Sequence, residues 1–298
     1  MDPSTKLVFD PPLLRVYDDG RVERFYGTEA TLPGSDAVTR VASKDVVVDS
    51  ATGVFVRFYI PDHLLTAEHK KVPILVYFHG GGFVVGSAVS PAYHRYLNSV
   101  ASKAGVLAVS VSYRLVLEHP LPTAYEDLWA ASGAADPWLS DHGDTRHVFL
   151  AGDSGGANIV HNIAIMAGAR GGLPSGVSLE GLILLHPVFS GEEPLDGESI
   201  ETREMMEKLW ALISPQSTEA PSLQNLACRK LLVCSAEGDY RARARATAYY
   251  QAVKESGWRG SMEWLESVGE EHVFFLHKPE CEESLALMDR LVAFLGED

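Results

Sequence analysis

The sequence predicts an α/β fold with a mostly parallel sheet of about eight strands flanked by helices. Two observations lead to this prediction. From residue 73 onward, short apolar runs alternate with amphipathic segments of helical length, a pattern typical of βαβ crossovers between parallel strands. The runs are apolar at nearly every position, as expected when helices cover both faces of a sheet.

Each expected parallel strand is a short apolar run; these runs are 73–79, 106–112, 147–152, 181–186, 230–236 and 261–267. The expected helices lie near 91–104, 123–135, 156–169, 203–213, 241–256 and 281–295. Two earlier runs, "DVVVD" at 45–49 and "VFVRFYI" at 54–60, predict antiparallel strands that extend one edge of the sheet. Residues 27–45 are rich in Gly, Ser, Thr and Asp and are expected to form a loop.

The N-terminal part of the chain contains a hairpin signal. Residues 12–26 alternate in character around Asp19-Gly20, a dipeptide suited to a tight turn. No repeat, low-complexity tract or linker divides the 298 residues. We therefore expect a single domain over residues 1–298, with a core from 41 to 298 that follows an N-terminal segment of about residues 1–40.

Composition restricts the classes of function. The net charge of −15 at pH 7 argues against binding to nucleic acids, which needs a basic surface, and against docking on anionic membranes. The first residues lack the pattern of a secretory signal, and no run approaches the roughly 20 apolar residues that span a bilayer. We therefore expect a soluble protein of the cytoplasm or nucleus, either a monomer or a homodimer.

Cysteine and histidine spacing gives no sign of a metal. Cys228, Cys234 and Cys281 are few and odd in number, so we expect buried, reduced thiols rather than a disulfide framework. The sequence has no CxxC or HExxH spacing. We expect neither a metal nor a cofactor.

The stretch "FLAGDSGGANIVHN", residues 149–162, surrounds Ser154 with glycines where a predicted strand gives way to a predicted helix. It matches G-x-S-x-G, the nucleophile elbow, in which a serine is held at the apex of a sharp turn. Gly152 and Gly156 fit because residues beside the apex must be nearly free of side chains. The alternative is a chance glycine-rich turn.

A second glycine-rich stretch, "YFHGGGFVVGS" at 77–87, follows another predicted strand. Consecutive glycines let backbone N–H groups converge on the negative oxygen that forms during acyl transfer. We expect Gly81, Gly82 and Gly155, with Gly80 as a further candidate, to form this oxyanion hole. His79 is expected to brace the loop. Just past the hole, Phe83 and Val84 are expected to line the substrate pocket or, equally, to belong to the core.

A serine nucleophile needs a base and an acid that orients the base. In this kind of fold the acid and then the histidine follow the serine along the chain, on loops after late strands. Asp239 and His272 meet this condition. Glu237 is the rival acid and His277 the rival base. The sequence therefore predicts a Ser154–His272–Asp239 triad.

With these motifs the chain resembles the plant carboxylesterases, a branch of the α/β-hydrolase fold related to hormone-sensitive lipase and to gibberellin receptors. The resemblance runs almost end to end and rests on "YFHGGGF", "FLAGDSGGANIVHNIA", "LLHPVF", "LLVCSAEGD" and "SMEWLESVGEEHVF". It implies hydrolysis of small to medium apolar carboxylic esters through the serine triad, without metal or cofactor. It also implies that about residues 1–40 pack over the pocket as part of a cap.

Three features depart from the family pattern. Val116-Leu117 replaces an Ala-Pro pair in "YRLVLEHPLP", which we expect to change a loop but not the chemistry. The acid loop, "EGDYRARAR", keeps its aspartate but loses the usual aliphatic spacing. The segment around 190–226 lacks a block that usually precedes the last strands, so we expect an altered pocket rim and a modest ester pocket.

Members of the same scaffold supply the rival functions. In gibberellin receptors an aliphatic residue stands at the position of the catalytic histidine, so the presence of His272 disfavours a receptor. 2-Hydroxyisoflavanone dehydratases share the triad region, and the motifs do not distinguish a lyase from an esterase. A third alternative, a binding protein without activity, leaves the intact triad unexplained.

Overall fold

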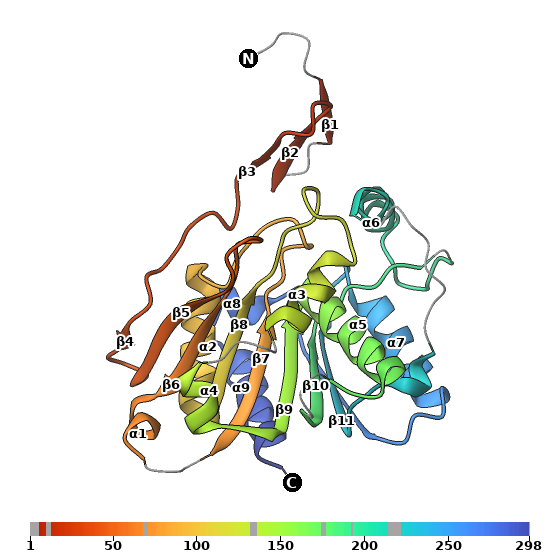
Figure 1. The fold of residues 1–298 in the computed structure, drawn as a ribbon. Helices are drawn as coiled ribbons and strands as arrows, with labels where there is room; N and C mark the ends of the chain where they lie inside the picture. Colours follow the sequence, from red (N-terminus) through yellow and green to blue (C-terminus); the bar gives the residue numbers. More distant parts are fainter. Residues whose placement is uncertain are drawn as a thin grey trace.

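The computed structural model describes residues 6–9, 13–67, 71–131, 136–173, 177–191, 193–213 and 222–297. Within them, nine strands form one sheet in the order β12-β11-β10-β9-β7-β8-β6-β5-β4 (Figure 1). The strands are β4 (Ser35–Asp36), β5 (Val41–Asp49), β6 (Val54–Pro61), β7 (Val72–Phe78), β8 (Leu107–Ser112), β9 (Gly143–Asp153), β10 (Leu179–Leu185), β11 (Lys230–Ala236) and β12 (Ser261–Ser267). The six strands from β12 to β8 pair in parallel, and β6, β5 and β4 continue the sheet antiparallel.

Helices cover both faces of this sheet. They are α1 (Asp62–Leu65), α2 (Pro91–Ala104), α3 (Thr123–Ala131), α4 (Pro137–His142), α5 (Gly155–Arg170), α6 (Ile200–Ile213), the 3₁₀ turn η2 (Leu223–Asn225), α7 (Arg243–Glu255), α8 (Phe274–His277) and α9 (Glu282–Gly296). In Figure 1, α3, α5 and α7 lie in front of the sheet and α2, α8 and α9 behind it. The expected three-layer arrangement is therefore present.

The core explains why the strand sequences are apolar throughout. Along β10, Leu182 and Leu184 pack into the core on the α5 side, whereas Ile183 and Leu185 pack into a second core with α9. All four side chains are fully buried. Because alternate residues of a strand point to opposite faces, a sheet covered on both faces needs apolar residues at every position.

The N-terminal segment forms a separate antiparallel sheet of three short strands, β1 (Leu7–Phe9), β2 (Leu14–Tyr17) and β3 (Val22–Arg24). Gly20, in the turn between β2 and β3, has a φ of +83°, which glycine adopts without steric cost. This confirms the hairpin expected at 12–26 over its described residues, and β1 adds a third strand. In Figure 1 this sheet and α6 lie at the same end of the molecule.

Several boundaries differ from the sequence prediction. β5 begins at Val41, within the expected loop, because Val41 and Ala42 pair with both β6 and β4 and are buried. The short strand β4 also lies in that loop and makes the sheet one strand larger than expected. Residues 132–135 of the helix expected at 123–135 lie outside the described residues. The same holds for residues 192 and 214–221 of the segment around 190–226 that lacks a block of the family pattern.

The cysteines and the helices bear on two further expectations. Cys228, Cys234 and Cys281 are free thiols; Cys234 is buried and the other two are half-buried. Among the described residues, none of the helices has the length and apolar character needed to cross a membrane.

Candidate active site

Ser154 lies at the turn between β9 and α5, with a φ of 52° and a ψ of −118°. A positive φ is uncommon for a residue with a side chain, so this conformation must be held by its surroundings. The Ser154 N–H donates to the Leu185 carbonyl at 2.9 Å, and the Ser154 carbonyl accepts from the Val188 N–H at 3.3 Å. The turn is thus fixed by the segment that follows the neighbouring strand β10.

The glycines beside Ser154 are required by close backbone approach. A Cβ on Gly152 would lie 2.5 Å from the carbonyl carbon of Gly156, and one on Gly156 would lie 2.1 Å from the Phe78 oxygen. Both distances are too short for any side chain, since two strands and a helix meet at this point. Gly152 and Gly156 therefore allow the elbow that exposes the serine hydroxyl.

His272 and Asp239 lie beside Ser154 although they are far apart along the chain. The Nε2 of His272 is 2.9 Å from Ser154 Oγ, and its Nδ1 is 2.6 Å from Asp239 Oδ2. Asp239 follows β11 and His272 follows β12, so parallel pairing brings both loops to the same end of the sheet. The three side chains named from the sequence form one continuous hydrogen-bonded chain.

Asp239 is held as a carboxylate. Its Oδ1 accepts from the backbone N–H groups of Arg241 and Ala242 at 3.1 and 3.0 Å. Burial by itself raises the pKa of Asp239, but hydrogen bonds from His186 and His272 outweigh it and lower the pKa below its ordinary range. The loop that departs from the family spacing thus still provides its backbone donors.

The rival acid and base lie elsewhere. Glu237 is exposed, and its carboxylate accepts from the Gly269 N–H at 3.0 Å. His277 is an exposed residue at the end of α8. His79 is fully buried, with Nδ1 2.8 Å from the Gly80 oxygen and its ring stacked on Tyr113 at 4.3 Å, as expected for a residue that braces the loop.

The loop after β7 presents backbone donors to the serine. Gly81 and Gly82 have φ values of 95° and 60°, and their N–H groups donate to no other residue in the described part of the chain. A Cβ on Gly155 would lie 3.2 Å from the Phe83 nitrogen, so the start of α5 packs against this loop. Donors on the loop and at the helix N-terminus therefore lie together beside Ser154.

Gly80 differs from the expectation. Its N–H donates to Asp153 Oδ1 at 3.0 Å and to the Tyr93 hydroxyl at 2.8 Å. A Cβ on Gly80 would lie 2.3 Å from Asp153 Oδ2, so the two residues are in direct contact. Gly80 therefore anchors the loop to the elbow, and its N–H is not free to stabilise an oxyanion.

Of the two alternatives for Phe83 and Val84, a pocket wall or the core, the structure favours the core. Phe83 is fully buried and Val84 nearly so, and both belong to the core on the α5 side. Phe83 meets the ring of Trp210 edge-on at 5.6 Å between centroids. The half-buried side chains above the glycine loop are instead Leu209 and Trp210 of α6, for which the sequence offered only an amphipathic helix.

Comparison with known proteins adds to this geometry. Residues 75–276 match the model of a protein family described by the α/β-hydrolase fold. The chain belongs to that family. The match confirms the predicted fold class.

Relatives of this α/β-hydrolase-fold protein include plant enzymes. It is 43% identical to 2-hydroxyisoflavanone dehydratase of Glycyrrhiza echinata over 96% of this chain and 94% of the relative. It is 36% identical to probable carboxylesterase 2 of Arabidopsis thaliana over 96% of this chain and 95% of the relative. The solved structure of esterase LipW from Mycobacterium marinum aligns with a TM-score of 0.70 at 27% identity, covering 87% of this chain and 82% of that one. The resemblance to plant carboxylesterases is therefore confirmed, and the family is esterase-like.

Asp153, the residue before the serine, is a buried group of this hydrolase-fold protein that the sequence analysis did not select. It accepts from the hydroxyls of Tyr77 at 2.8 Å and Tyr93 at 3.0 Å as well as from Gly80. Burial raises the pKa of Asp153 to about 6, although these hydrogen bonds and the charge of His272 act in the opposite direction. A carboxylate directly after the apolar run 148–152 was the signal that could have identified it.

The N-terminal sheet is tied to the glycine loop through Arg24. Its guanidinium donates to the Val84 carbonyl at 2.6 Å and forms two hydrogen bonds with Glu118, at 2.7 and 2.6 Å. Glu118 belongs to the loop in which Val116-Leu117 replaces Ala-Pro. Leu117 has a φ of 101°, which proline cannot adopt, so this loop has a conformation that the family's proline would exclude.

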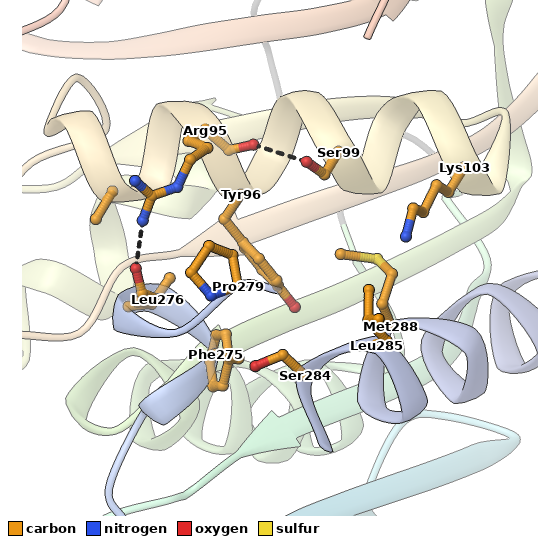
Figure 2. Close-up of a pocket in the computed structure, with 11 residues that line it drawn as sticks. Arg95, Tyr96, Ser99, Lys103, Phe275, Leu276, Pro279, Ser284, Leu285 and Met288 are labelled. Carbon is orange, nitrogen blue, oxygen red and sulfur yellow. Dashed lines mark hydrogen bonds between the residues drawn. The ribbon is translucent and has the colours of Figure 1, made fainter. Parts of the chain in front are cut away.

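A surface hollow of about 60 Å³ lies away from these residues, between α2 and the helices α8 and α9 (Figure 2). Across it, the Arg95 guanidinium of α2 donates to the Leu276 carbonyl of α8 at 2.5 Å. Because α8 begins two residues after His272, this contact supports the segment that carries the histidine. The hollow contains none of the site residues described above.

One group of possible metal ligands occurs in the described part of the chain. The ligand atoms of His186, Asp239 and His272 lie within 4.8 Å of one another. Both imidazoles place Nδ1 within 3.3 Å of Asp239 Oδ2, so a proton on each Nδ1 accounts for the approach of the three groups.

Proposed function

We propose that this protein hydrolyses carboxylic esters through an acyl-enzyme intermediate, with Ser154 as nucleophile, His272 as general base and Asp239 as the orienting acid. The observation that carries the proposal is the uninterrupted chain of contacts, 2.9 Å from Ser154 Oγ to His272 Nε2 and 2.6 Å from His272 Nδ1 to Asp239. The esterase-like family supports it.

The mechanism follows from these contacts. His272 Nε2 accepts the Ser154 proton as Oγ attacks the ester carbonyl, and Asp239 stabilises the imidazolium. The Gly81, Gly82 and Gly155 N–H groups donate hydrogen bonds to the negative oxygen of the tetrahedral intermediate. The tetrahedral intermediate collapses, the alcohol leaves with the proton from His272, and an acyl-serine remains. Water, deprotonated by the same imidazole, then releases the acid and restores Ser154.

The apolar side chains above the loop indicate the kind of ester. Leu209 lies close to Gly82, where a Cβ would be 3.6 Å from its Cδ2, and Trp210 contacts Phe83. An acyl chain bound beside the oxyanion hole would meet these side chains. We therefore propose small to medium, uncharged, apolar esters as substrates.

The test is hydrolysis of p-nitrophenyl acetate, butyrate and octanoate by the wild type, Ser154→Ala and Ser99→Ala. Loss of the nucleophile should lower kcat by roughly 10⁴- to 10⁶-fold. Ser99→Ala, which removes a hydroxyl from α2 away from the site, should match the wild type and serves as the control. Equal rates for Ser154→Ala and wild type would overturn the assignment of the nucleophile.

Dehydration of a 2-hydroxyisoflavanone is the second candidate, and the 43% identity to a protein named for that activity favours it. Loss of water from this substrate needs a general base and no acyl-enzyme. Incubation of the purified protein with a 2-hydroxyisoflavanone, alongside the esters, separates the two. Isoflavone formation that survives Ser154→Ala, without ester turnover by the wild type, would favour the lyase.

A further inference from the structure

A second histidine contacts the carboxylate of the proposed triad. His186 follows β10 directly, is fully buried, and has a φ of 48°. Its Nδ1 is 3.3 Å from Asp239 Oδ2, the same oxygen that faces His272. The His186 and His272 rings meet edge to face at 5.7 Å between centroids.

The surroundings of His186 fix which of its nitrogens carries the proton. With the proton on Nε2, a buried N–H would have no acceptor among the described residues, and the Nδ1 lone pair would face the Asp239 carboxylate. That tautomer would gain a contact from the Val273 N–H at 3.3 Å. With the proton on Nδ1, the imidazole donates to the carboxylate. This tautomer leaves the Nε2 lone pair unused and removes the acceptor of the Val273 N–H, which belongs to a half-buried residue. A hydrogen bond to a buried carboxylate outweighs that long contact, and a buried N–H donor without an acceptor beside a repulsive pair of acceptors costs more.

We propose that His186 is a positioning residue for ester hydrolysis. It donates from Nδ1 to Asp239 Oδ2, which fixes the orientation of that carboxylate and weakens its interaction with His272. This inference rests on the proposed function. His186 does not touch the ester; it acts through Asp239.

The expected direction of the effect follows from the charges around His272. The groups that face it are the Asp239 carboxylate after β11, His186 after β10, Asp153 at the end of β9 and the neutral Ser154 hydroxyl. Burial lowers the pKa of His186, which therefore remains a neutral donor. Without that donor, the Asp239 carboxylate would interact with His272 alone and would stabilise its imidazolium form more strongly.

Two replacements separate donation from packing. His186→Asn keeps an N–H donor close to the position of Nδ1, whereas His186→Leu fills similar space without one. In ester hydrolysis, His186→Leu should lower kcat about 10-fold or more with KM within about twofold. It should also move the acidic limb of the kcat/KM profile to higher pH by about half to one unit, and His186→Asn should restore most of both.

The ¹⁵N spectrum of the His186 ring keeps the test independent of turnover. If the protein is inactive, the proposed function fails, yet the position of the His186 proton can still be measured in the wild type. A one-bond ¹⁵N signal that places this proton on Nδ1, together with a wild-type-like kcat and acidic limb in His186→Asn, supports the proposal even if His186→Leu does not fold. A proton on Nε2, or a His186→Leu variant that keeps the wild-type kcat and pH profile, overturns it.

Discussion

Two buried aspartates lie close to the serine, and their pKa values shift in opposite directions although they are the same residue at the same depth. Asp153 and Asp239 are each 1% exposed, and each follows or ends a parallel strand. For both, burial is the largest influence and raises the pKa. The net results are opposite: the pKa of Asp153 rises to about 6, and that of Asp239 falls below its ordinary range.

The difference lies in the donors. Asp153 receives hydrogen bonds from two tyrosine hydroxyls and one backbone N–H, all of them neutral. Asp239 accepts hydrogen bonds from two backbone N–H groups and faces two imidazoles. One of these, His272, becomes a cation in the proposed reaction. Burial alone therefore does not decide the charge of a carboxylate. Asp153 joins the glycine loop to the elbow, and Asp239 balances charge.

The largest expected effect separates the two roles in catalysis. Asp239→Asn should lower kcat for ester hydrolysis by about 10³- to 10⁴-fold at neutral pH, because the amide no longer stabilises the imidazolium of His272. Asp153→Asn should lower it far less, by about 10- to 100-fold, through displacement of the glycine loop. Steady-state kinetics of both variants on p-nitrophenyl butyrate measures the difference. Equal losses of kcat in the two variants would contradict the separate roles of Asp239 and Asp153.

The second effect concerns stability and pH. The folded state holds the Asp153 proton more tightly than the unfolded chain, so its contribution is full below its ordinary pKa of 3.8 and is lost as the pH rises through about 6. The free energy of unfolding of wild type minus Asp153→Asn should therefore fall by about 2 kcal/mol between pH 4 and 7. Urea unfolding across this range is the measurement.

Asp239→Asn is the matched control for this pH series. The pKa of Asp239 is lowered on folding, so its contribution is present above its ordinary value and is lost only as the pH falls below about 4. The titration of the Asp239 carboxyl group itself should therefore add no fall to the difference between wild type and Asp239→Asn from pH 4 to 7, in contrast to that of Asp153. If the free energies of unfolding of the two variants changed in parallel with pH, the raised pKa of Asp153 would be contradicted.

The smallest effect concerns one hydroxyl among the donors to Asp153. Tyr93 and Tyr96 are neighbours on α2 and are both buried. The Tyr93 hydroxyl bonds Gly80 and Asp153, whereas the Tyr96 hydroxyl has no partner among the described residues. Tyr93→Phe should lower the free energy of unfolding by about 1–2 kcal/mol, and Tyr96→Phe should leave it within about 0.5 kcal/mol. Similar losses would show that Tyr93 contributes by packing alone.

Local sequence was a reliable guide where one short stretch fixes the geometry. Gly152, Ser154 and Gly156 identified the elbow because backbone crowding at that turn excludes side chains. The order of strands and helices followed from the alternating apolar runs. Val41 and Ala42 were predicted as loop because they lie in the segment 27–45, whose composition is that of a loop. Their pairing with two neighbouring strands decides their structure instead.

Side-chain partners were harder to predict. Gly80 was expected to serve the oxyanion hole, but its N–H is taken by a carboxylate 73 positions further along the chain. The sequence left Phe83 either at a pocket wall or in the core, and the structure places it in the core, against Trp210 of α6. His186 was not selected from the sequence, because nothing near it along the chain indicates a contact with Asp239.

The sequence by itself determined the fold class, the elbow and the three side chains that form one hydrogen-bonded chain, Ser154, His272 and Asp239. Motif spacing and strand order suffice for these. The tertiary structure alone decided which N–H groups of the glycine loop remain free, which apolar side chains cover that loop and which buried aspartate has a raised pKa. The physical reason is that hydrogen-bond partners and burial depend on residues brought together from distant parts of the chain, and a carboxylate's pKa is the sum of those contacts.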